Sequence, residues 1–145
     1  MAEPGSSTAP ALRQVLETCL YVEDMGVARR FYEQVLGLTP QFFDERIASY
    51  RLGSTMLLLF RAGGTLQAVE TPAGKIPPHD GRGPTHFALS IPSESLDAWR
   101  EHLDRHHVPL ESEVAWRKDG AISLYFRDPD KHLVELATPG LWGIE

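Results

Sequence analysis

The sequence predicts an α+β fold in which two βαβββ modules, residues 12–61 and 84–140, form an eight-stranded open cup. Three observations predict it. Strand-like alternation, a helical pattern and three further strand-like runs follow one another in the same order in both halves. A shift of 69 residues places Glu17 on His86 and aligns the surrounding apolar positions. A segment rich in Gly and Pro, residues 62–83, separates the halves and predicts a connecting loop.

In the first module, residues 1–11 predict a flexible tail and Val15–Val22 a strand with alternating faces. Asp24 is a predicted cap for a helix that carries apolar residues at helical spacing and ends at Gly37. Three strands are expected to complete the module: Pro40–Asp44, Ile47–Leu52 and Thr55–Arg61.

In the second module, the same order returns after the 62–83 segment, which we interpret as a linker or a lid. His86–Ile91 predicts a strand, and Ser93 is the expected cap of a helix whose apolar face includes Trp99. Three strands again complete the unit: Leu110–Trp116, Ala121–Arg127 and His132–Thr138.

Composition and charge exclude several classes of protein. A net charge of -6, without a cluster of Lys and Arg, argues against nucleic-acid binding and favours a small-molecule substrate. The longest apolar run, Met56–Phe60, has the length of a strand, so no membrane span is expected. Cys19 is the only cysteine, and the first ten residues lack the pattern of a signal peptide, which together predict a cytoplasmic protein.

The most informative stretch is DPDKHLVEL, Asp128–Leu136. Its Asp-Pro-Asp start predicts a type I turn, because proline presets φ at the second position. The following strand is apolar except for Glu135, and burying an ionised carboxylate costs several kcal/mol unless it is paired or bound to a cation. Glu135 is therefore a candidate metal ligand, although an edge strand with Glu135 facing water would explain the same pattern.

Two further residues support the metal hypothesis. Glu17 and His86 occupy equivalent positions on the first strands of the two modules, on the face turned away from the helices. Period-2 alternation places Glu135 on the corresponding face of the last strand. If the sheets curl toward each other, two carboxylates and one imidazole would suit a divalent first-row metal.

Three motifs carry a family resemblance: LYVEDMGVARRFYEQVLGL, GPTHFALSI and RDPDKHLVEL. They resemble the vicinal-oxygen-chelate superfamily, which includes glyoxalase I, fosfomycin-resistance thiol transferases, extradiol dioxygenases and bleomycin-binding proteins. The resemblance implies a single glyoxalase-like domain over residues 12–140, a homodimer, and a divalent metal ion (Zn, Ni, Mn or Fe) held by Glu17, His86 and Glu135. It also implies that Glu135 transfers protons, with Glu17 as a possible second catalytic residue.

Departures from the family pattern bear on the reaction. Glyoxalase I has a fourth ligand, a glutamate, where this chain has Met56–Leu59. Extradiol dioxygenases use histidine where this chain has Glu17. The fosfomycin thiol transferases use three ligands, and the resemblance matches Ser123 and Tyr125 to their substrate contacts. Lys131 replaces the glycine that usually follows the Asp-Pro-Asp turn.

These observations favour a metal-dependent glyoxalase-type isomerase or lyase that acts on a small vicinal-oxygen substrate. The alternatives are a metal-free binding protein of the bleomycin-resistance type, a thiol transferase and a dioxygenase. Tyr21 and Trp116 are further candidate substrate-binding residues, and both would equally suit packing within strands. The sequence leaves open whether Glu17 joins the other two ligands of its own chain or those of a partner.

Overall fold

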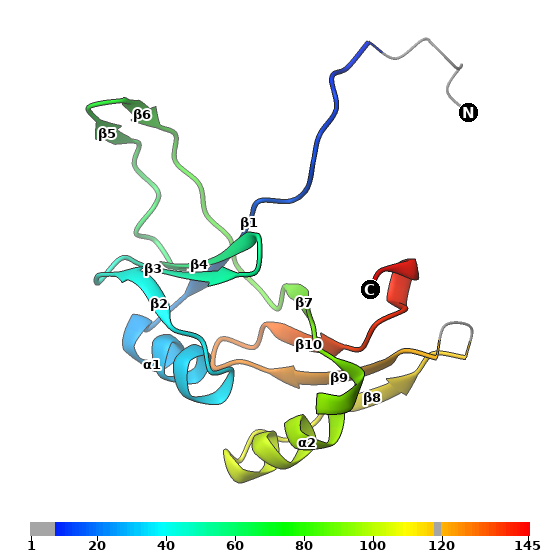
Figure 1. Cartoon of the computed structure of the whole chain (residues 1–145). Helices are drawn as coiled ribbons and strands as arrows, with labels where there is room; N and C mark the ends of the chain where they lie inside the picture. The colour runs from blue at the N-terminus through cyan, green and yellow to red at the C-terminus, as the bar shows by residue number, and fades with distance from the viewer. Residues whose placement is uncertain (1–7, 118–119) are drawn as a thin grey trace.

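Two open four-stranded sheets form the body of the protein (Figure 1), in a computed structural model that describes residues 8–117 and 120–145. The predicted tail residues 1–7 lie outside the described part of the chain. The first sheet has the order β1-β4-β3-β2 and the second the order β7-β10-β9-β8, with β1 parallel to β4 and β7 parallel to β10. The strands are β1 Glu17–Val22, β2 Pro40–Phe43, β3 Ile47–Leu52, β4 Thr55–Arg61, β7 His86–Ser90, β8 Ser112–Ala115, β9 Ile122–Arg127 and β10 Leu133–Ala137. The predicted α+β fold with two βαβββ modules is confirmed.

The first helix begins as predicted and then changes its winding. Asp24 Oδ1 accepts a hydrogen bond from the Val27 amide at 3.0 Å, which caps α1, Met25–Arg30. The helix continues as a π-helical turn, η1, Phe31–Val35, where one continuous α-helix was expected. Gly37, at φ 70°, ends it, because a left-handed conformation costs glycine no steric penalty.

The second helix begins differently from the prediction. Ser93 does not cap α2; it opens a 3₁₀ turn, η2, Ser93–Ser95, and α2 follows as Leu96–Arg105. The N-cap residue Ser95 makes no capping bond, because its hydroxyl donates back to the Pro92 carbonyl at 2.8 Å and closes the 3₁₀ turn.

One core joins the two modules. Both helices lie on the same side of the sheets (Figure 1), and the first helix packs against the second sheet, with the rings of Phe31 and Phe126 6.3 Å apart. The buried Tyr32 hydroxyl donates to Asp128 Oδ2 at 2.6 Å. The halves are therefore held together by apolar contact and by a buried polar bond.

The predicted Asp-Pro-Asp turn is confirmed. The Lys131 amide donates to the Asp128 carbonyl at 3.0 Å, and Asp128 Oδ1 accepts from the amides of Asp130 and His132. Lys131 has φ 71°, a left-handed conformation that glycine adopts more readily. This conformation explains why a glycine is usual at this position.

The connecting segment has structure of its own. Within residues 62–83, β5, Val69–Thr71, and β6, Gly74–Ile76, form a hairpin that projects beyond the first sheet (Figure 1). The first strand starts at Glu17, so the predicted positions Val15 and Leu16 belong to an irregular arm. After β10, a short 3₁₀ turn, η3, Leu141–Gly143, ends beside the second sheet.

Candidate functional site

Glu135 lies buried at the centre of the second sheet. It is 4% exposed, and its Oε1 lies 3.1 Å from Nε2 of His86 on the neighbouring strand. His86 Nδ1 is 2.9 Å from the Leu133 carbonyl, which can only accept, so Nδ1 carries the hydrogen. In the neutral imidazole, Nε2 therefore carries the lone pair and lies beside Glu135 Oε1, so a cation between them would be bound by both atoms.

The second oxygen of Glu135 has its own partner. The Ser123 hydroxyl, on β9, donates to Glu135 Oε2 at 2.6 Å, and the Trp116 indole N–H donates to Ser123 Oγ at 2.9 Å. Ser123 is fully buried. Its predicted role as a substrate contact stays a prediction, since this structure shows its hydroxyl engaged with Glu135.

A broad pocket opens above this pair. It has a volume of about 1000 Å³, and its lining includes Tyr125, Trp116 and the C-terminal turn with Trp142. Partial burial and the nearby Glu135 carboxylate raise the pKa of Tyr125, so its phenol stays protonated at neutral pH. The site therefore offers a neutral hydroxyl and an indole ring beside a buried carboxylate.

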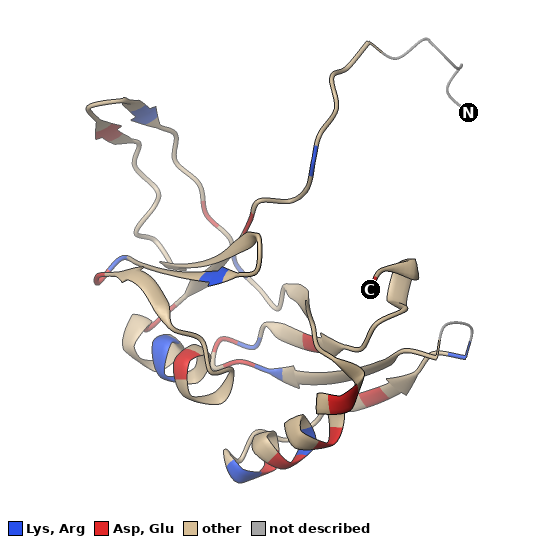
Figure 2. Cartoon of the chain, viewed as in Figure 1, with Lys and Arg blue, Asp and Glu red and all other residues tan. Residues whose placement is uncertain are grey.

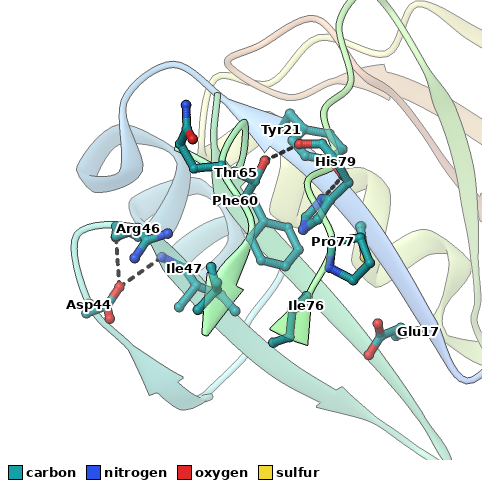
Figure 3. Close-up of a pocket in the computed structure, with 13 residues that line it drawn as sticks. Glu17, Tyr21, Asp44, Arg46, Ile47, Phe60, Thr65, Ile76, Pro77 and His79 are labelled. Atoms are coloured by element: carbon teal, nitrogen blue, oxygen red, sulfur yellow. Dashed lines mark hydrogen bonds between the residues drawn. The ribbon is translucent and has the colours of Figure 1, made fainter. Parts of the chain in front are cut away.

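Glu17 lies elsewhere. It lines a separate pocket of about 610 Å³ on the first sheet, together with Cys19 and Tyr21 (Figure 3). Within residues 8–117 and 120–145, no group of three His, Cys, Asp or Glu side chains is placed to hold a metal. The structure thus brings His86 and Glu135 together and leaves Glu17 apart from them in the same chain.

The first-sheet pocket has an aromatic wall closed by the connecting segment. His79 Nδ1 lies 2.5 Å from the Tyr21 hydroxyl, and its ring packs on Phe60 with centroids 4.8 Å apart (Figure 3). Thr65, in the turn that precedes β5, fixes His79, since its hydroxyl donates to the His79 carbonyl at 2.5 Å. Partial burial raises the pKa of Tyr21, which favours the phenol as the donor to His79.

The absence of a fourth ligand also has a structural basis. Glu17 pairs with Met56 in the parallel register, as His86 pairs with Leu133. Two residues further along, Leu58 therefore occupies the position in the first module that Glu135 occupies in the second. The first module supplies one carboxylate where the second supplies a carboxylate and an imidazole.

His86 and Glu135 together could supply two ligands of a divalent metal. Two ligand atoms converge, each is held by a hydrogen bond through its other side, and the carboxylate is buried among apolar neighbours. Such supporting bonds orient metal ligands in proteins generally. A third ligand is required, and Glu17 is the remaining predicted residue.

Comparison with known proteins identifies the family. The family described as the glyoxalase/bleomycin resistance protein/dioxygenase superfamily matches residues 14–136. The chain belongs to this superfamily. Membership accounts for the paired modules.

Individual relatives differ in their named activities. The chain is similar to lactoylglutathione lyase from Agrobacterium tumefaciens, with 31% identity, a TM-score of 0.83, and coverage of 93% of this chain and 100% of that one. It is 28% identical over 128 residues to the metallothiol transferase FosB of Staphylococcus epidermidis, covering 88% of this chain and 82% of the relative. The fosfomycin resistance protein FosX of Listeria monocytogenes shares the fold, with 20% identity, a TM-score of 0.68, and coverage of 92% and 98%.

Residues of both charge signs are distributed over the described part of the chain (Figure 2). Lys and Arg alternate with Asp and Glu along α2, and the described residues form no single basic face (Figure 2). Arg100, for example, is paired with both Asp97 and Glu113. Among the described residues, no helix has the length and apolar character needed to cross a bilayer.

Sequence reasoning missed two parts of the site. His79 was assigned only to the loop, although it forms the aromatic wall with Tyr21 and Phe60. The C-terminal turn lay beyond the predicted domain end at residue 140, yet Trp142 and Ile144 line the second pocket. No local pattern signals either contact, because both depend on how distant segments pack.

Proposed function

We propose that the protein is a cytoplasmic, metal-dependent enzyme of the glyoxalase type, an isomerase or lyase that acts on a small substrate with vicinal oxygens. The convergence of His86 Nε2 and Glu135 Oε1 at 3.1 Å is the observation that carries the proposal. A buried carboxylate aligned with an imidazole lone pair is a binding site for a divalent cation. The similarity to a lactoylglutathione lyase over 93% of this chain supports the same reaction class.

The chain's own residues have distinct tasks in such a reaction. A divalent metal at this site would act as a Lewis acid on two neighbouring oxygens of the substrate. When Oε1 is released from the cation, Glu135 can take a proton from the substrate there and return it, while Ser123 holds Oε2. Tyr125 and Trp116 line the pocket around the substrate. Glu17 is a second carboxylate that can exchange protons from the opposite side.

We propose further that the third ligand comes from a second copy of the chain, in a homodimer. Glu17 and the His86–Glu135 pair line different pockets of one protomer, and each half is open to a partner. The arm before β1 exposes apolar side chains, with Leu12 97% and Val15 72% exposed, which favours a contact surface. Two copies related by a two-fold axis would place each Glu17 opposite the partner's pair.

Metal binding by untagged protein tests the proposal. Titration of the metal-free protein with Zn²⁺, Ni²⁺, Mn²⁺ and Co²⁺ is expected to show one site per chain for at least one of these ions. Glu135→Gln should weaken that affinity by more than about 100-fold, because a first ligand matters more than a supporting residue. Glu111→Gln is the matched control, since Glu111 pairs with Arg127 on the surface of the same module. Unchanged affinity in Glu135→Gln would contradict the proposal.

A thiol transferase is the second candidate, favoured by the similarity to FosB. The two candidates differ in what they consume. A glyoxalase-type enzyme converts a hemithioacetal without net loss of thiol, whereas a transferase adds a thiol to an epoxide. Assaying the metal-loaded protein with a hemithioacetal and with an epoxide plus thiol separates them, and Glu135→Gln should abolish whichever activity is present.

A further inference from the structure

The hydrogen-bond chain from Trp116 through Ser123 to Glu135 has a fixed direction. An indole N–H can only donate, and a carboxylate can only accept. The Ser123 hydroxyl lies between them, 2.9 Å from Trp116 Nε1 and 2.6 Å from Glu135 Oε2. Its oxygen must therefore accept from the indole while its hydrogen is given to the carboxylate.

Among the described residues, Ser123 Oγ bonds Trp116 and Glu135, and the Tyr125 phenol is the further polar group close to both Ser123 and Glu135. The Ser123 side chain is fully buried, so water does not compete for the hydroxyl. Trp116 is held at the start of the β8–β9 turn, where its amide donates to the Ala121 carbonyl at 2.8 Å. The indole N–H thus points at Ser123 from a fixed backbone, while the ring is 38% exposed.

The chain of bonds divides the two oxygens of Glu135 between two tasks. Oε2 is occupied by Ser123, and Oε1 faces His86 Nε2 at 3.1 Å. A carboxylate held in this way offers a single oxygen to a ligand and cannot rotate without losing a charge-assisted hydrogen bond. Such bonds orient metal ligands and affect their affinity.

We infer that Trp116 and Ser123 are positioning residues that hold Glu135 with Oε1 alone turned to the metal. This inference rests on the proposed function, and it gives Trp116 a task beyond lining the substrate pocket. Because the exposed face of Trp116 lines that pocket, a bound molecule that moves the ring would also move the carboxylate.

Conservative variants test whether Trp116 and Ser123 position Glu135. Trp116→Phe keeps an aromatic ring and removes only the N–H, and Ser123→Ala removes the hydroxyl. Titration with Co²⁺ is expected to show an affinity about 10- to 100-fold weaker for Ser123→Ala and a smaller loss for Trp116→Phe. The double variant should bind like Ser123→Ala alone, because Trp116 acts only through Ser123. Trp99→Phe, in α2 and outside both pockets, is the matched control and should bind like the unmodified protein.

Indole N–H resonances of the metal-free protein provide a readout that does not need metal. The resonance lost in Trp116→Phe identifies Trp116, and it is expected to shift in Glu135→Gln, because the carboxylate polarises the Ser123 hydroxyl. A contact that only packs the β8–β9 turn would leave this resonance unchanged.

The outcomes separate the two proposals. If the unmodified protein binds no metal, the proposed function fails. The indole resonance alone then shows whether Trp116 is coupled to Glu135 through Ser123. If Trp116→Phe and Ser123→Ala both bind metal as tightly as the unmodified protein, the positioning role of Trp116 and Ser123 is overturned and the proposed function stands. A shifted resonance with non-additive losses of affinity supports both.

Discussion

The two modules repeat one fold but prepare their functional residues differently. In the second, Glu135 is buried and held by Ser123, and His86 is oriented by a backbone carbonyl. In the first, Glu17 is exposed, and within the described residues its side chain makes no hydrogen bond or ion pair. The second sheet therefore has a pre-organised half-site, while the first has a pocket with an aromatic wall.

This difference shows which of the proposed ligand atoms are held in place within one chain. Hydrogen bonds to both sides of the His86–Glu135 pair set its ligand atoms before any cation arrives. Among the described residues, none supports Glu17 in this way, and under the proposed dimer its final position would be set by the partner subunit. The first module instead supplies shape, through the aromatic wall of Tyr21, Phe60 and His79.

The largest loss of stability is expected at the contact between the two modules. Asp128→Ala removes the acceptor of the buried Tyr32 hydroxyl and the partner of His132. It also leaves two backbone amides of the turn without their side-chain acceptor. Removing one partner of a buried charged network costs about 3 to 5 kcal/mol, measured as the free energy of unfolding in urea.

Asp97→Ala is the control for this prediction. Asp97 also forms an ion pair, with Arg100, but its side chain is 91% exposed, so its removal should cost about 0 to 1 kcal/mol. A similarly small loss in Asp128→Ala would mean that the modules are joined by apolar packing alone.

Mixing two variants that each lack one proposed ligand tests whether the metal site is shared between the two subunits of a dimer. Glu17→Gln and Glu135→Gln should each bind metal about 100-fold more weakly than the unmodified protein. If the site is shared, a refolded mixture contains heterodimers with one intact site, so tight binding returns to about a quarter of the sites. A site within one chain gives no recovery. Analytical ultracentrifugation of each variant checks that both remain dimeric.

The sequence predicted the fold well for local reasons. Period-2 alternation, the Asp24 cap and the Asp-Pro-Asp turn are all encoded by neighbouring residues, and the 69-residue repeat linked the two modules. The same repeat placed Glu17 and His86 at the starts of equivalent strands, as the structure has them. The pairing of His86 with Glu135 followed from the alternation of β10.

The rest of the site depends on contacts that no local pattern encodes. The separation of Glu17 from the other ligands follows from how the sheets pack, and His79 reaches Tyr21 across 58 residues of sequence. The hydrogen-bond chain to Glu135 could not be predicted either, because it depends on the Trp116 N–H pointing inward while the ring faces the pocket.

A smaller effect is expected where the connecting segment meets the first sheet. Gly81 lies against the Tyr21 ring, and an added Cβ would be 2.5 Å from Tyr21 Cδ2. Gly81→Ala should push the segment away and break the Tyr21–His79 bond, at a cost of about 1 to 3 kcal/mol. Hydrogen exchange should show faster exchange of the His79 amide, which donates to the Thr65 carbonyl. Gly26→Ala, within α1, is the control and should not change exchange in the segment.

The smallest effect concerns pH and the buried His132. The hydrogen bond to Asp128 raises the pKa of His132 above its ordinary value near 6.5, against the effect of burial. The group also faces Asp130 and the Tyr32 hydroxyl, which shares Asp128 Oδ2. A raised pKa in the folded state means that the stabilisation is fully present below pH 6.5 and is lost as pH rises through the folded pKa.

Urea unfolding between pH 6 and 9 should therefore show the stability advantage of the unmodified protein over His132→Gln shrinking as pH rises. Asp130 does not mask this trend. Burial raises the pKa of its carboxyl, and because Asp130 is present in both proteins, its own titration largely cancels in the difference between them. An advantage that stays constant across the range would show that His132 contributes as a neutral donor to Asp128. The contact between the modules would then be held by hydrogen bonding without a charge on the imidazole.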